Sequence, residues 1–348
     1  YAVQALPYLM EYPYECSEQV FNRYYANALA TTIANASPRL KEVFESWKTL
    51  DTAALLSNLQ KNEQLKSVLL QETPWVLQAK NETEQKKKLA LLFDMVRMSK
   101  EGNATLSKLK DLQLANGGFA WFKGGRDDRY ITQYILTGIG HLQKLKALPA
   151  DNATLNAITQ AALRYADLRI RESYEELLRQ NKHAEPEKGN IAHVEIQYLY
   201  MRSFFPGIPV PANVQKAYAY YFKQAKLHWI HQSRYMQGMI ALALYRMGEA
   251  PVAKNILASL KENAIDSKEN GMHWKEIRDG YFWYDGAIEA QALMIEAFAE
   301  IDKDANVITK LKTWLLKQKQ TQHWRTTKAT ADACYALLLQ GSDWLTDA

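Results

Sequence analysis

The 348-residue sequence lacks the marks of a membrane span, a disulfide framework and an all-β fold. No run of about eighteen apolar residues occurs, so no transmembrane helix is predicted. With 15 glycines and 10 prolines, the chain has few turn-forming residues for an all-β protein. Its two cysteines, Cys16 and Cys334, lie far apart, which does not indicate a disulfide framework.

The chain also lacks a strong excess of one charge. Its 43 basic and 38 acidic residues are interspersed, and the net charge of +5 is too mild and scattered to indicate a nucleic-acid partner. No signal peptide is recognisable. Because the chain begins within a patterned stretch at Tyr1 and stops shortly after a predicted helix, near Asp347, we expect residues 1–348 to be a single domain cut from a larger multidomain protein.

Apolar residues recur at helical spacing through nearly the whole chain. Tyr130, Tyr134, Ile139 and Leu142 follow one stripe of the i, i+4 type. No β-type alternation of convincing length occurs. The sequence therefore predicts an all-α fold.

A loose internal repeat accompanies this periodicity. His-Trp pairs begin at His228, His273 and His323, at intervals of 45 and 50 residues, each before an alanine-rich helix. One period has room for a helix pair, and a closed ring of such pairs would bury every inner face. We expect the tryptophans to anchor loops against the next helix. His228 and His231 come closest to metal-ligand spacing, but neither a metal nor a cofactor is predicted.

The segment from Cys16 to Gln19 is the part of the chain most suggestive of chemistry. A cysteine sulfur can displace ammonia from the amide of a glutamine three positions away, which leaves an internal thioester. That acyl group is strongly electrophilic because its leaving group is a stable thiolate. The other interpretation is a buried free cysteine beside an ordinary helical glutamine.

The flanks of this motif carry a family resemblance. The string from Tyr12 to Gln19 resembles the thioester region of the alpha-2-macroglobulin and complement superfamily, and the Tyr-Pro-Tyr before the motif is closest to the bacterial branch. The stretches 73–75, 116–119 and 324–327 are also similar to that branch. The resemblance implies an α/α-toroid of about six helical hairpins with a thioester between Cys16 and Gln19.

Residues close to the motif in sequence are candidates for supporting roles. The thioester must stay dry until it reacts, and we expect Tyr12, Tyr14 and Phe21 to help form an apolar cover. Glu18 is a candidate support residue in the first helical turn, where the helix dipole favours its charge. A charge at a helix end with no chemical role is the alternative for Glu18.

The same resemblance implies a covalent protease inhibitor rather than an enzyme. In complement-type relatives a loop histidine directs the acyl group to hydroxyls, but the corresponding loop here, residues 117–130, contains no histidine. We therefore predict direct attack by amines, mainly lysines of a trapped protease. The other expected partners are further domains of the parent protein, and the expected location is the periplasm or cell envelope, with a possible lipoprotein anchor.

Two alternatives remain open at this stage. One is a helical protein-binding module whose thioester is unformed or hydrolysed. The other is a toroid enzyme such as a glycosidase or terpenoid synthase, for which Asp127-Asp128, or Asp279, Asp285 and Glu289, are the candidate acidic residues.

Overall fold

The computed structural model describes residues 2–11, 15–34, 98, 101–149, 151–180, 189–275, 286–319 and 324–339. Helices dominate these residues, and the all-α prediction is confirmed. The strands form two short antiparallel hairpins, β1 with β2 and β3 with β4. No helix in the described ranges is both long and apolar enough to cross a membrane.

The elements follow one another along the chain with these bounds. The α-helices are α1 (Ala2–Glu11), α2 (Ser17–Ala34), α8 (Arg129–Lys144), α9 (Ala153–Gln180), α10 (His193–Arg202), α11 (Gln215–His228), α12 (Arg234–Arg246), α13 (Ala250–Glu262), α14 (Ala287–Ala297), α15 (Ala305–Lys317) and α16 (Thr327–Leu338), and residues 101–112 are also helical. The strands are β1 (Phe119–Ala120), β2 (Asp127–Asp128), β3 (Ile265–Ser267) and β4 (Gly271–His273), and the short turns are η1 (Trp229–His231) and η2 (Phe298–Asp302).

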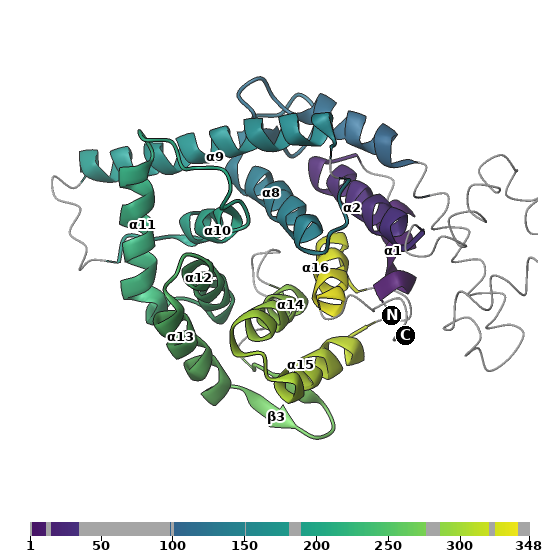
Figure 1. Cartoon of the computed structure of the whole chain (residues 1–348), viewed down its shortest axis with the longest axis vertical. Coiled ribbons are helices and arrows are strands. Elements are labelled where there is room, and N and C mark those ends of the chain that lie inside the picture. The colour runs from purple at the N-terminus through teal and green to yellow at the C-terminus, as the bar shows by residue number, and fades with distance from the viewer. Residues whose placement is uncertain are drawn as a thin grey trace, which may run out of the picture.

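Helices α2, α8, α10, α12, α14 and α16 form what we call the inner ring. Each contacts the next in this order, and α16 contacts α2, which closes the ring. Figure 1 looks nearly along these helices, with α9, α11, α13 and α15 lying outside them. Helix α1 packs on both α2 and α16. The all-α class is thus established, while the name α/α-toroid remains our interpretation of this ring.

The inner helices bring their amino-terminal turns to one end of the ring. Arg129 of α8 pairs with Glu195 of α10 at 3.0 Å. The ring of His193, at the start of α10, stacks on Tyr235 of α12 with centroids 6.3 Å apart. Lys328 of α16 lies 5.8 Å from the centre of that tyrosine ring. We call this the amino end of the ring, and it contains Cys16.

Side-chain caps explain where several of these helices begin. Asp128 accepts from the backbone N–H of Ile131 at 3.0 Å and starts α8. Thr326 accepts from Ala329 N–H at 3.0 Å and starts α16. Each cap satisfies an N–H that has no carbonyl partner within its helix.

Two of the three repeated tryptophans fix corresponding loops. The indole N–H of Trp274 donates to the carbonyl of Leu260 at 2.8 Å, and that of Trp324 donates to Leu315 at 3.1 Å. Both acceptors lie near the carboxyl end of the preceding outer helix. These two hydrogen bonds tie the loops to the helix before them. The Trp274 ring also lies 6.3 Å from the ring of Phe298, directly after the next helix α14, as expected from the sequence. Trp229 instead lies in η1 and is half-buried.

Candidate functional site

Cys16 and Gln19 lie one helical turn apart at the start of α2. The carbonyl of Cys16 accepts from Val20 N–H at 3.0 Å, so Cys16 caps the helix and Gln19 is its third residue. Side chains at i and i+3 share one helix face, and a residue at this third position can reach back to the cap. Cys16 is a free thiol with 6% of its surface exposed. The sequence motif is thus placed where its two side chains can meet.

The surroundings of the Cys16 thiol favour its protonated form. Burial raises the pKa of Cys16, and the nearby negative charge of Glu18 acts in the same direction. Backbone N–H groups of Gln19 and Glu18 oppose this shift in pKa. Because these N–H groups face the sulfur, they would also stabilise a thiolate released at this position.

The Gln19 side chain contains a buried hydrogen-bond acceptor. Its Oε1 atom is buried and, among the described residues, has no hydrogen-bond partner. An unsatisfied buried acceptor costs roughly 1–3 kcal/mol. The carbonyl oxygen of the amide that the thioester chemistry would consume is therefore not held by a hydrogen bond in the described part of the chain.

Glu18 is held at the centre of the site. Its Oε1 accepts from Asn22 Nδ2 at 2.5 Å and from Thr327 Oγ1 at 2.7 Å, while Cys16 Sγ lies 3.9 Å from Oε2. Burial raises the pKa of Glu18, and the Thr327 hydrogen bond and the Lys328 charge offset part of that increase. Among the described contacts, Glu18 is held by neutral donors rather than by a cation.

Two of the stretches that resemble the family, 12–19 and 324–327, meet at this point, together with residues 120 and 121, which directly follow the stretch 116–119. Ser17 donates from its backbone N–H to the carbonyl of Trp121 at 2.9 Å and from its hydroxyl to Ala120 at 2.5 Å. Thr327, from the stretch 324–327, reaches Glu18. The turn before β1 needs glycine because Gly117 has φ +88° and a Cβ there would lie 2.2 Å from the Ala161 carbonyl oxygen. The stretch 73–75 lies outside the described residues.

Sequence reasoning missed Asn22, Thr327 and Ser17 as members of the site. Asn22 follows Glu18 by four residues, a spacing that places both on one helix face and was available as a signal. Thr327 is 309 positions from Glu18. No local pattern in the sequence connects two residues so far apart.

The predicted apolar cover is described only in part. Tyr12 and Tyr14 lie outside the described residues. Phe21 is 1% exposed, and its ring packs against α8, where a Cβ on Gly138 would come within 2.2 Å of it. At about 100° per residue, Phe21 is on nearly the opposite side of α2 from Gln19. The role of Phe21 as a cover for the thioester stays a prediction.

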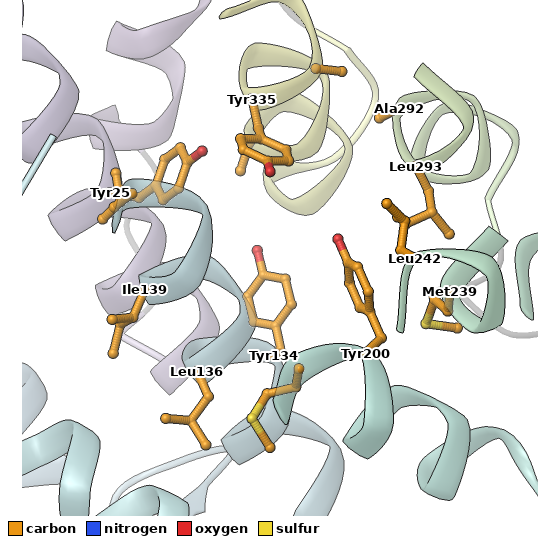
Figure 2. Close-up of a cluster of buried hydrophobic side chains, with 14 of the residues drawn as sticks. Tyr25, Tyr134, Leu136, Ile139, Tyr200, Met239, Leu242, Ala292, Leu293 and Tyr335 are labelled. Atoms are coloured by element: carbon orange, nitrogen blue, oxygen red, sulfur yellow. The ribbon is translucent and has the colours of Figure 1, made fainter. Parts of the chain in front are cut away.

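The interior of the ring contains a small cavity that is lined by both apolar and polar side chains. It has a volume of about 40 Å³, room for about three waters. Figure 2 shows the hydroxyls of Tyr134, Tyr200 and Tyr335 pointing toward the same central space. Tyr134 also donates to Asn22 Oδ1 at 2.7 Å, which connects this cavity to the Glu18 hydrogen bonds.

The residues considered for an enzyme have structural roles or cannot be placed. Asp127 binds Tyr165 and Arg169 at 2.6 and 2.8 Å, and Asp128 caps α8. Glu289 is 5% exposed and lines the cavity. Asp279 and Asp285 lie outside the described residues.

The rings of His228 and His231 are 6.4 Å apart, and no group of three metal-ligating side chains occurs within the described ranges.

Comparison with known structures identifies where this fold occurs. The native alpha-2-macroglobulin of Escherichia coli, in a crystal structure from domain MG7 to the C-terminus, matches with a TM-score of 0.51 and 16% identity over 97% of this chain and 42% of that one. A crystal structure of Salmonella alpha-2-macroglobulin reacted with methylamine matches with a TM-score of 0.53 and 14% identity, over 98% of this chain and 17% of that one. The chain shares its fold with part of bacterial alpha-2-macroglobulin.

The matched structures are longer than this chain and share little sequence identity with it. This chain spans less than half the length of the alpha-2-macroglobulin structures that it matches. No protein-family model and no curated protein matches the sequence. At these low identities the likeness establishes the fold, and the resemblance expected from the sequence is confirmed at that level.

Proposed function

We propose that this chain is the thioester domain of a bacterial alpha-2-macroglobulin-like protease inhibitor. The observation that carries the proposal is the placement of Cys16 and Gln19 one turn apart at the buried start of α2. The fold shared with a Salmonella alpha-2-macroglobulin that was reacted with methylamine supports the same conclusion. The whole chain, residues 1–348, is one domain of a larger exported protein of the periplasm or cell envelope.

The covalent step consumes one bond and forms another. A lysine amine of a protease attacks the side-chain carbonyl carbon of Gln19, and the bond from this carbon to the Cys16 sulfur breaks. The sulfur leaves with the electron pair and takes up the proton that the amine loses. The product is an isopeptide between Gln19 and the protease, with a free Cys16 thiol. Each molecule reacts once, so the protein acts as a covalent trap and not as an enzyme.

Amines are the preferred nucleophiles in this proposal because the loop of residues 117–130 contains no histidine. The aromatic row beside it, Trp121 on Tyr130 and Tyr130 on His193, has centroid spacings of 6.3 and 6.0 Å. The Tyr130 ring therefore lies between His193 and Trp121, which belongs to this loop. Burial lowers the pKa of His193 to about 4, so this imidazole is neutral at pH 7, and its separation from the loop rather than its charge supports the preference for amines.

Covalent capture by the full-length protein tests this function. After incubation with a lysine-containing endopeptidase, we expect a product that survives denaturing electrophoresis, with a protease lysine linked to Gln19 by peptide mapping. Pretreatment with methylamine and the Cys16→Ala variant should each abolish this product. Cys334→Ala is the matched control, because Cys334 is fully buried and its Sγ contacts the Ala2 carbonyl, away from Gln19.

Other results would point to a different function. Capture that is lost on denaturation and is unchanged in Cys16→Ala would replace the trap with a protein-binding module whose thioester is unformed or hydrolysed. Labelling by glycerol as fast as by methylamine would contradict the preference for amines.

A further inference from the structure

The Glu18 carboxyl is positioned against a reacting atom of the proposed thioester. Two donors from different helices, Asn22 of α2 and Thr327 of α16, fix its Oε1 atom at 2.5 and 2.7 Å. The other oxygen, Oε2, is the atom that the Cys16 thiol approaches, with 3.9 Å between sulfur and oxygen. This separation is long for a hydrogen bond, as is common for catalytic groups before they reach the reacting geometry.

Closing the thioester requires a proton to move between two groups. The Cys16 thiol must lose its proton before the sulfur becomes a good nucleophile. The Gln19 amide nitrogen must gain a proton before it can leave as ammonia. A single carboxyl next to the thiol can accept the first proton and then deliver it to the nitrogen.

We infer that Glu18 is the general acid–base that closes the Cys16–Gln19 thioester, a role that rests on the proposed function. The Glu18 carboxylate takes the thiol proton, and the Cys16 sulfur attacks the Gln19 side-chain carbonyl carbon to form the S–C bond. Glu18 returns the proton to the amide nitrogen. The C–N bond then breaks, ammonia leaves, and Glu18 is again a carboxylate.

The same residue serves the opening of the bond. Attack of ammonia on the thioester is the reverse of its formation, so by microscopic reversibility the same proton carrier acts in both directions. With methylamine, the amine proton passes to Glu18 and then to the sulfur as the S–C bond breaks. One side chain therefore connects formation of the thioester with its reaction toward small amines.

The surroundings of Glu18 suit this exchange of protons. Burial raises the pKa of the carboxyl and brings it closer to neutrality, where a group can both accept and donate a proton. The charged groups facing it from α16 are Lys328 and Asp332, which pair with each other at 2.8 Å. From α8, the Tyr134 hydroxyl reaches Glu18 through Asn22.

Thioester closure in newly made protein tests this role. Wild type and Glu18→Gln would be produced as the full-length protein by cell-free synthesis, and the loss of one ammonia followed by intact mass over time. Glutamine has the shape of glutamate and keeps an acceptor for Asn22 and Thr327, but it cannot carry the proton. We expect closure to be about 100-fold slower in Glu18→Gln, within the range for a general acid–base.

Further measurements separate this chemistry from a structural role. Glu18→Asp, which keeps a carboxyl, should close faster than Glu18→Gln even where the two have equal thermal stability. The closure rate of wild type should rise with pH through a carboxyl titration that is missing from Glu18→Gln. Equal closure rates in wild type and a folded Glu18→Gln would overturn the inference. Failure of wild type to lose ammonia would overturn both this inference and the proposed function.

Discussion

The two ends of the inner ring each bury a carboxylate, but in opposite settings. At the amino end, Glu18 is held by Asn22 and Thr327, and burial raises its pKa. At the other end, Glu296 in the last turn of α14 binds Arg246 of α12 at 2.5 Å and Tyr335 of α16 at 2.7 Å. Burial would raise the pKa of Glu296 as well, but the charge of Arg246 leads the effects that lower it to about 2.

The partner, rather than the depth of burial, decides what each carboxylate can do. Neutral donors hold Glu18 in place without fixing its charge, so it can exchange a proton with a neighbour. A guanidinium locks Glu296 in its charged form, and Glu296, bound by Arg246 and Tyr335, joins α12, α14 and α16. The amino end is therefore suited to chemistry, and the carboxyl end to holding the ring closed.

The largest expected effect comes from removing Arg246, which lies nearer to Glu296 than Lys144 does, at 2.5 Å against 3.6 Å. Arg246→Met leaves Glu296 buried without its guanidinium partner, and we expect it to lower the free energy of unfolding by about 3–5 kcal/mol. Urea denaturation measures this change. The control is Lys226→Met, which breaks a 2.7 Å pair with Glu249 at a partly exposed position and should cost at most about 1 kcal/mol. Equal losses in the two variants would contradict the role assigned to the Arg246 pair.

A somewhat smaller effect should appear as pH dependence. The ring of His141 stacks on Tyr335 with centroids 3.6 Å apart, and burial lowers the pKa of His141 from 6.5 to about 4. Between pH of about 6.5 and about 4, His141 is protonated in the unfolded chain but not in the folded chain. The free energy of unfolding therefore falls as the pH drops through this range. At about 1.4 kcal/mol per pKa unit, the loss approaches roughly 3 kcal/mol.

His141→Phe should remove the His141 part of this acid sensitivity, because phenylalanine keeps an aromatic ring against Tyr335 but cannot be protonated. A second part should remain, because burial lowers the pKa of His193 to about 4 as well. Urea denaturation at several pH values between 4 and 7 would measure both parts. Glu18 acts in the opposite direction, because a raised carboxyl pKa contributes stability that is lost as pH rises from 4.5 through the folded pKa. A His141→Phe profile as steep as wild type would contradict the assignment to His141.

The smallest expected effect tests the neutral donors at the amino end. Thr327→Val removes the hydroxyl that binds Glu18 and should cost about 1 kcal/mol of stability. Thr309→Val, which removes an exposed hydroxyl that binds the Ala305 carbonyl, is the control and should change stability by less than about 0.5 kcal/mol. A loss in Thr327→Val as large as that in Arg246→Met would erase the distinction between the two ends.

Local patterns predicted the helices and the reactive pair. Helical spacing of apolar residues is enough to predict an all-α fold, and Cys16 and Gln19 are close in sequence. The contact of Glu18 with Thr327 could not be predicted, because the first and last inner helices meet only when the ring closes. For the cluster around Glu296 at the carboxyl end, the sequence contains one indication, which is the single acidic residue Glu296 within the apolar stretch 292–297. Its partners Arg246 and His141 lie on other helices, at no fixed spacing from it.

The intact mass of the full-length protein, with and without methylamine, tests the central claim most directly. The account predicts a native mass lighter than the sequence by one ammonia, followed by uptake of one methylamine and release of one thiol at Cys16. An unchanged sequence mass with no uptake would mean that the Cys16–Gln19 bond does not form. The chain would then be a helical ring without thioester chemistry.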